Sequence, residues 1–150
     1  MIAKPKWDMP HSTFDELKVN TRIKLVALWA SVMFFYIYGD YFALYIPNQA
    51  SKLVNGDTLL NKPIKVFAAS VLMSLPSLVI IATVIARAEI ARWTNIVFGL
   101  IFTAIMLLIA VTSIPVTAEI AAYVFYAVVE SCITLVVVKL AWKWPKESKA

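Results

Sequence analysis

The chain has 150 residues, of which 61% are hydrophobic and 15% are charged, and its formal net charge is +5. A soluble protein of this length cannot bury so much apolar surface, so the composition favours a single membrane domain over residues 1–150. We therefore interpret the positive charge as a signal of topology and of lipid headgroups, and we expect no binding to nucleic acid.

Residues 1–21 form a polar N-terminal segment that precedes the apolar part of the chain. Ser12 and Thr13 are typical helix caps, and Asp15 and Glu16 would occupy the first turn of a helix that begins there. We expect a short juxtamembrane helix that bends or continues into the first membrane span. The acidic residues before that span argue against a cleaved signal peptide.

Four stretches of the chain are nearly free of charge, and each has the ~20 residues that a helix needs to cross a bilayer. Polar and apolar residues do not alternate with a period of two, so strands are not expected. We predict an all-α integral membrane protein whose spans lie near residues 22–46, 64–86, 93–111 and 118–140. The second and third connections are short, which favours an antiparallel up-down-up-down bundle. A longer loop over 47–63, with a turn at Asn55-Gly56-Asp57, joins the first two spans.

Lysine and arginine are distributed unevenly between the two ends of these spans. Eleven of them lie in or next to the N-terminal segment, the second connection and the C-terminal end, whereas the other three, Lys52, Lys62 and Lys65, lie in or next to the loop over 47–63. The positive-inside rule then places both termini in the cytoplasm. We expect a multi-pass protein of the bacterial inner membrane.

The first span carries a single acid, Asp40, between Leu25 and Pro47. Tyr36 and Asp40 are four residues apart and share a helical face. Acidic residues are expensive in lipid, so they usually face the interior of a bundle or a cavity. Asp40, Tyr36 and Tyr38 are therefore candidates for a proton, ion or ligand site. The alternative is a hydrogen bond between helices that fixes their packing.

The fourth span also carries one acid, Glu130, between Ile120 and Val138. Tyr123, Tyr126 and Glu130 follow one another at helical spacing, and Glu130 lies roughly 15–18 Å from the nearer end of the span, close to the bilayer centre. No lysine or arginine is expected at that depth. The carboxyl is then neutral and hydrogen-bonded, hydrated, or paired with a group from outside the protomer. We consider Glu130, Tyr123 and Tyr126 as site candidates, and packing is again the alternative.

Small and polar residues in the two middle spans favour packing over chemistry. Gly99 and Thr103, four residues apart, form a weak small-residue pair that lets helices approach closely. Ser70, Ser74 and Ser77 recur on one face beside Pro76. These residues predict close helix contacts.

Several chemistries are disfavoured by what the sequence lacks. It has one histidine, His11, which precedes the spans, and one cysteine, Cys132. A metal site, a bis-histidine haem site, an internal disulfide and a dithiol redox centre therefore cannot be built from one chain. No phosphate-binding loop or zinc-protease motif is present. We expect no enzyme, no cofactor and no metal.

The first span also carries a resemblance. Residues 24–29, KLVALW, followed by residues 34–40, FFYIYGD, resemble the first-helix pattern of a small bacterial membrane-protein family of unknown function. In length and four-helix layout the chain is similar to the DoxX-like superfamily. The resemblance marks Trp29, Tyr36, Tyr38 and Asp40 as motif positions and implies no activity. The redox association of some DoxX-type proteins is not implied, because cofactor ligands are lacking.

Two classes of function remain open. In the first, the chain is a proton- or cation-linked transporter or channel subunit, with Glu130 binding and releasing the ion and Asp40 as a second station. Four helices enclose little volume, so we expect a homo-oligomer in the lipid bilayer, with a small ion or small molecule as ligand. In the second, the chain is a non-catalytic scaffold or partner subunit whose acids serve helix packing.

Overall fold

The computed structural model describes residues 18–114 and 120–145. Within these residues the chain forms five helices and no strand, which confirms the all-α prediction. The helices are α1 (Thr21–Ala43), α2 (Gln49–Asn55), α3 (Pro63–Ile85), α4 (Ala88–Thr112) and α5 (Ala121–Trp142).

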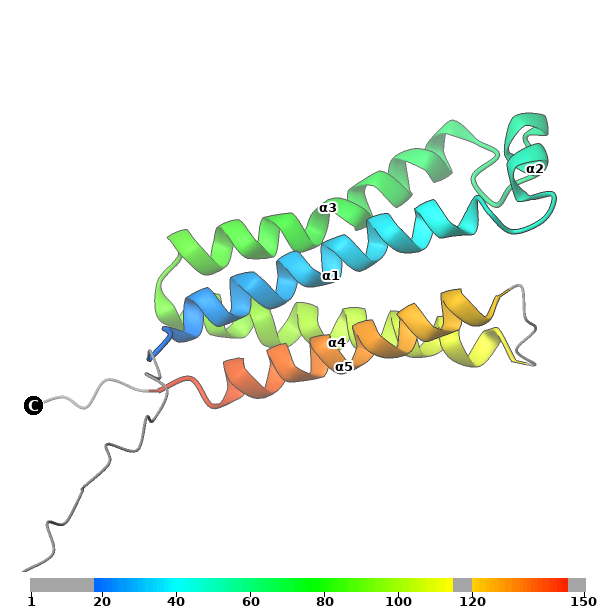
Figure 1. Cartoon of the computed structure of the whole chain (residues 1–150). Coiled ribbons are helices and arrows are strands. Elements are labelled where there is room, and N and C mark those ends of the chain that lie inside the picture. The colour runs from blue at the N-terminus through cyan, green and yellow to red at the C-terminus, as the bar shows by residue number, and fades with distance from the viewer. Residues whose placement is uncertain (1–17, 115–119, 146–150) are drawn as a thin grey trace, which may run out of the picture.

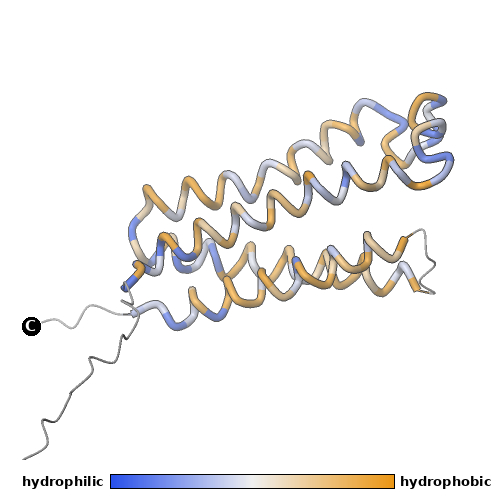
Figure 2. The backbone as a smooth tube through the Cα atoms, in the orientation of Figure 1, coloured by the Kyte–Doolittle hydropathy of each residue, from blue (hydrophilic) through white to orange (hydrophobic). Residues whose placement is uncertain are grey.

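The four long helices form an antiparallel bundle in which each helix packs on two neighbours. α1 contacts α3 and α5, and α4 contacts the same two helices from the other side (Figure 1). All four are long and apolar enough to cross a membrane. Figure 2 shows apolar residues along most of each long helix and hydrophilic residues gathered toward the ends. Helices that are apolar all round at the surface of a small bundle are typical of a multi-pass membrane protein.

The helix bounds agree with the predicted spans except at the start of α4. That helix begins at Ala88, five residues before the predicted start at Trp93. Charge in this segment suggested a connection, but Glu89 lies in the first turn, where a carboxylate complements the helix dipole. The predicted juxtamembrane helix falls on residues 1–17, which lie outside the described residues. Residues 18–20 are not helical, and the Asn20 side chain caps α1.

The loop predicted over 47–63 contains the short helix α2. The helix ends at Asn55 and is capped by Gly56, whose φ of 75° lies in the left-handed region, at the position predicted for a turn. Leu53 and Leu59 are 58% and 89% exposed, so α2 and the segment after it do not fold over the bundle core.

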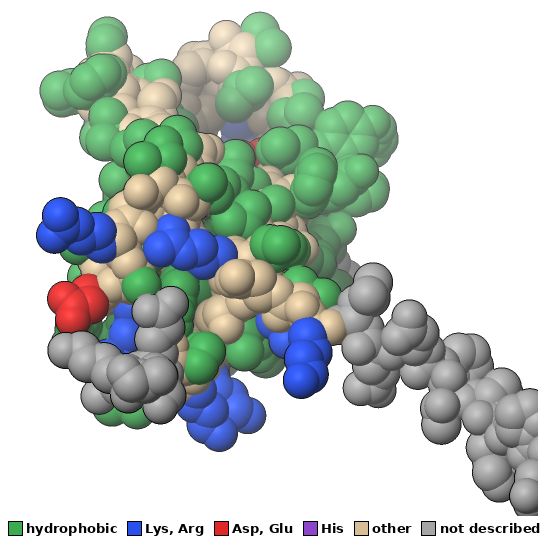
Figure 3. All heavy atoms as spheres, turned by 90° about the vertical axis from the view of Figure 1, so that its left-hand side faces the viewer, with side chains coloured by type: hydrophobic (Ala, Val, Ile, Leu, Met, Phe, Trp, Pro, Cys, Tyr) green, Lys and Arg blue, Asp and Glu red, His purple; other side chains and the backbone are tan. Residues whose placement is uncertain are grey.

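The end of the bundle where α1 begins and α5 ends carries the arginines Arg22, Arg87 and Arg92, and we call it the arginine end. The opposite end is the α2 end. The Arg22 guanidinium donates to the carbonyl oxygens of Thr83 and Ala86 at 2.8 and 2.9 Å, where α3 ends. Arg92 donates to the carbonyl of Ala141 at 3.2 Å, where α5 ends. Arg22 therefore satisfies carbonyls that the end of α3 leaves unpaired, and Arg92 adds a bond to the Ala141 carbonyl, which also accepts from the Trp144 backbone N–H at 3.3 Å. Figure 3 looks onto this end and shows lysine and arginine side chains around it.

The half of the bundle next to the arginine end is closed by a buried polar network. The indole N–H of Trp29 donates to Oδ1 of Asn95 at 2.8 Å, and Nδ2 of Asn95 donates to the Thr83 hydroxyl at 2.7 Å and to the Ala91 carbonyl at 2.8 Å. Trp29, Thr83 and Asn95 are fully buried. The Trp29 ring also meets Phe102 edge to face, with 5.7 Å between centroids. These contacts join α1, α3 and α4.

Candidate functional site

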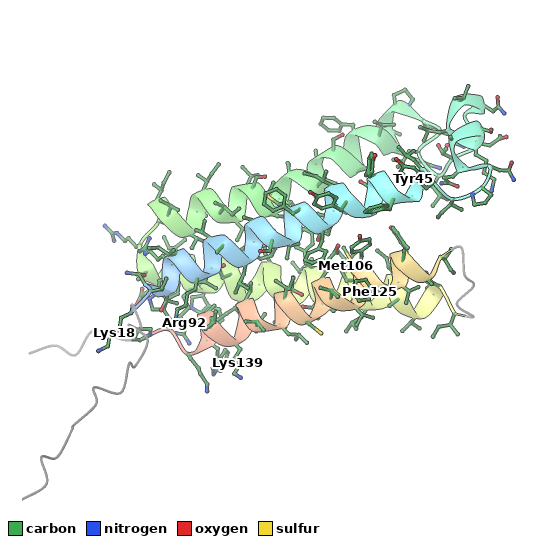
Figure 4. The ribbon with its side chains drawn as sticks, in the orientation of Figure 1. Lys18, Tyr45, Arg92, Met106, Phe125 and Lys139 are labelled. Atoms are coloured by element: carbon green, nitrogen blue, oxygen red, sulfur yellow. The ribbon has the colours of Figure 1, made fainter. Side chains whose placement is uncertain are left out.

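The bundle opens toward the α2 end, where the pair α1 and α3 diverges from the pair α4 and α5 (Figure 1). A cavity of ≈ 100 Å³, which we call the deep cavity, lies between all four long helices in this half. Figure 4 labels Met106, which lines it from α4. Its polar lining side chains come from α1 and α5: Tyr36, Asp40, Tyr123, Tyr126 and Glu130.

A second cavity of ≈ 440 Å³, the entrance cavity, lies between the deep cavity and the α2 end. Its lining includes Tyr45 and Pro47, which follow the last residue of α1, and Figure 4 labels Tyr45 at this end. The two cavities share the wall residues Gly39, Tyr123 and Tyr126. A continuous row of lining residues therefore leads from the α2 end to Glu130.

Glu130 is the buried acid at the inner end of this row. The residue is 3% exposed and lines the deep cavity. Its backbone carbonyl accepts from the Thr134 hydroxyl at 2.9 Å, but its carboxyl makes no hydrogen bond to another described residue. Burying a carboxyl without a partner is unfavourable, so such a group usually serves a purpose other than packing.

Two polar groups of α1 line the same cavity. Asp40 lies one helical turn from Tyr36, as the spacing predicted, and both side chains line the deep cavity. The Tyr36 hydroxyl is buried and has no hydrogen-bond partner among the described residues. Its ring packs against Phe102 with 6.2 Å between centroids. Two carboxyls and one hydroxyl therefore line the deep cavity, and none of them makes a hydrogen bond to another described residue.

The wall between the cavities consists of Gly39 and two tyrosines of α5. A Cβ atom at Gly39 would lie 3.9 Å from the ring of Tyr126, an ordinary van der Waals contact, so α1 and α5 lie side by side here. Tyr126 also packs against Phe35, with 5.8 Å between centroids. Tyr38, by contrast, is 54% exposed and lines neither cavity. It is two residues from Tyr36, which on a helix turns its side chain toward the opposite face.

The network around Asn95 was not among the predicted site residues, although the resemblance marked Trp29. This network lies between the deep cavity and the arginine end. Phe102 connects the two, because it contacts Trp29 and also lines the cavity. An uncharged amide in the third predicted span was the available signal. Thr134 lies one helical turn after Glu130 on α5. Its hydroxyl bonds to the hydroxyl of Thr103 at 2.7 Å and so joins α4 to α5.

The chemistry of the site is that of carboxyl and hydroxyl groups. The described residues hold no group of three or more His, Cys, Asp or Glu side chains that could bind a metal ion. Deep-cavity lining from α3 and α4 is apolar. The arrangement can bind a proton or a cation at Glu130 and Asp40, with access from the α2 end.

Comparison with known proteins gives a family and no activity. The model of a family described as a family of unknown function, DUF6326, matches residues 13–150. No curated protein and no solved structure matches the chain significantly. The similarity to the DoxX-like superfamily in size and layout stays a prediction.

Proposed function

We infer that this chain, which belongs to the family of unknown function DUF6326, is a transporter or channel subunit that moves a proton or another cation with its intramembrane carboxyls. The observation that carries the proposal is the environment of Glu130. Its side chain is buried among apolar helices, with 3% of the residue exposed, and it lines a cavity. Its carboxyl makes no hydrogen bond to another described residue. Acids at this depth in membrane proteins commonly mark ion or proton pathways.

The proposed route runs from the α2 end through the entrance cavity to the deep cavity. Glu130 binds and releases the cation, and Asp40 is a second station nearer the entrance. Tyr36, Tyr123 and Tyr126 line the way. The closed network around Asn95 separates this route from the arginine end, as expected for one access state of a carrier.

The charge distribution supports an orientation for this route. Arg22, Arg92 and Lys139 lie at the arginine end, so the positive-inside rule places that end in the cytoplasm of a bacterial inner membrane. The cavities then open to the opposite face. Four helices around so small a cavity leave little room for a complete pathway, which favours a homo-oligomer.

The alternative function is a non-catalytic scaffold or partner subunit. On that hypothesis Glu130 and Asp40 would join helices through hydrogen bonds, as Asn95 does. No such bond of either carboxyl occurs among the described residues, so we favour transport. Neither function involves an enzymatic step, a cofactor or a metal.

Flux measurements in liposomes test the proposal. Purified chain is reconstituted, and proton or alkali-cation flux is followed with entrapped pH- or ion-sensitive dyes under an imposed gradient. We expect flux in the parent protein, its loss in Glu130→Gln and a reduction in Asp40→Asn. Asp57→Asn, which removes an exposed carboxyl of the loop before α3, is the matched control and should retain parental flux.

The outcomes separate the two functions. Absence of flux in the parent, or equal flux in the parent and Glu130→Gln, would reject transport through this site. Loss of the folded state in both carboxyl variants, judged by helical circular dichroism and elution in detergent, would instead favour the scaffold.

A further inference from the structure

The two joined cavities are acidic and contain no compensating positive charge. Glu130 and Asp40 line the deep cavity, and no lysine, arginine or histidine lines either cavity among the residues that the structure describes. In a low-dielectric interior two carboxylates attract a cation strongly and repel an anion. The charge of the site therefore selects a positively charged ligand.

The wall of the deep cavity is aromatic, which distinguishes between kinds of cation. Phe35, Tyr36, Phe102 and Tyr126 all line it. A hard metal ion takes roughly six oxygen ligands or more, whereas this wall offers few oxygen atoms. Aromatic faces attract alkylammonium groups through the ring quadrupole, and that attraction is strongest where water is excluded. The lining thus favours a weakly hydrated organic cation.

The two cavities differ in size and polarity. The deep cavity has a volume of ≈ 100 Å³ and can hold a compact cationic head. The entrance cavity of ≈ 440 Å³ is lined by apolar side chains, including Phe42, Ile46 and Pro47. A ligand with a small charged head and an apolar arm would fill both.

We propose that the joined cavities bind an amphipathic organic ammonium cation, with its head between Glu130 and Asp40 and its apolar arm in the entrance cavity. This proposal rests on the proposed function, because it names the class of cation that the site carries. The ammonium charge pairs with the Glu130 carboxylate, and the alkyl groups contact the Phe102 and Tyr126 rings.

Binding of phenyltrimethylammonium to the full chain in lipid nanodiscs tests the proposal. Radiolabelled probe is titrated onto the parent protein and onto Glu130→Gln, Asp40→Asn and Asp57→Asn. Removing one member of a buried charge pair should weaken binding by at least about tenfold in Glu130→Gln. Asp40→Asn should weaken it less, because Asp40 is exposed on part of its surface. Asp57→Asn is the control outside both cavities and should bind like the parent.

A competitor of the same shape separates charge from hydrophobicity. tert-Butylbenzene has the form of the probe without its charge, and it should fail to displace the probe at matched concentration in the membrane. Equal displacement by the neutral compound, or equal binding by the parent and Glu130→Gln, would overturn the proposal. Should Glu130→Gln not fold, Asp40→Asn decides, and unchanged probe binding in that variant is then the contradicting result.

The flux assay keeps this proposal distinct from the proposed function. Glu130-dependent proton or alkali-cation flux without probe binding would overturn the ammonium ligand and leave transport standing. Glu130-dependent binding without any flux, of the probe or of inorganic ions, would support the ammonium site and reject transport.

Discussion

Glu130 and Asn95 are both polar residues buried in the bundle, and their surroundings differ. Asn95 bonds through both ends of its amide, to Trp29, Thr83 and Ala91. The Glu130 carboxyl has no such bond within the described part of the chain and faces the deep cavity. A satisfied amide stabilises the bundle, whereas a buried acid without a hydrogen-bond partner destabilises it.

Replacement of Asn95 by alanine should destabilise the folded chain. The Trp29 indole and the Thr83 hydroxyl would lose their buried partner, and the expected loss is about 1–3 kcal/mol in the free energy of unfolding. Denaturation in mixed micelles, followed by circular dichroism, measures it. Asn61→Ala removes an exposed amide that bonds only to the Lys65 ammonium, and its stability should match the parent. Equal stability of both variants would contradict the structural role of Asn95.

Ligand binding at Glu130 should weaken as the pH falls, because a proton and an ammonium cation compete for the same carboxyls. The titratable groups that face Glu130 across the deep cavity are Asp40 and Tyr36 of α1 and Tyr123 and Tyr126 of α5, while α3 and α4 present apolar side chains. Probe affinity measured from acidic to neutral pH should therefore rise with pH in the parent and rise less in Glu130→Gln. The infrared band of a protonated carboxyl should lose intensity in the same variant. An affinity that is independent of pH would exclude proton competition at this site.

At the scale of helices, α4 and α5 are in close contact at Gly99. A Cβ atom there would lie 2.7 Å from a methyl group of Val138 and 3.4 Å from the Thr134 carbonyl. One turn further along α4, Thr103 bonds to Thr134. The small-residue pair that the sequence suggested therefore lies in a close contact between α4 and α5, where a larger residue than glycine would displace Val138.

Gly99→Ala should destabilise the bundle, since its methyl group would displace Val138 from a packed interface. Overpacking of this kind typically reduces stability by about 1–3 kcal/mol. Gly39→Ala is the matched variant, because its Cβ would make an ordinary contact 3.9 Å from Tyr126. Unfolding of both variants in the same micelles should show a loss for Gly99→Ala alone. Comparable losses at both glycines would contradict the role of close approach at Gly99, because the higher helix propensity of alanine should by itself stabilise both helices.

The sequence predicted the long helices well because lipid demands long uncharged segments, and a gap in charge is readable without knowing the fold. It failed at the start of α4 and at α2, where charge is compatible with a helix and local geometry decides. Tyr36, Asp40 and Glu130 were predicted because acids in apolar spans are rare. Their convergence on one cavity depends on which helices are neighbours. Asn95 escaped prediction because its role comes from partners on two other helices.

At the scale of the whole molecule, the Asn95 network closes the interior of the bundle on the side of the arginine end, and the joined cavities lie toward the α2 end. The arginines and the Asn95 network hold the helices together at the arginine end, and the divergence of α1 and α3 from α4 and α5 leaves both cavities toward the α2 end (Figure 1). Such asymmetry gives the site one direction of access. The proposed orientation makes that direction the outside of the cell.

Cysteine labelling in intact cells should show this orientation. In a Cys132→Ser background, a cysteine replacing Lys52 in α2 should react with a membrane-impermeant maleimide added outside, because that residue is exposed beyond the end of α1. A cysteine replacing Lys143, just after α5, should react only after the cells are permeabilised. The reverse pattern of labelling would invert the topology and place the cavity entrance in the cytoplasm.

The contacts of the arginine end also impose an order on biogenesis. Arg22 is translated 61 residues before its acceptor Thr83, and Trp29 is translated 66 residues before Asn95. α1 therefore leaves the ribosome with a guanidinium and an indole N–H whose partners have not yet been synthesised. Until α3 and α4 arrive, water and lipid headgroups are the available partners for these groups. The contacts of α1, the first helix to be synthesised, are thus completed only after α4 has been synthesised. A nascent chain that ends before Asn95 lacks the amide that joins Trp29 of α1 to Thr83 of α3.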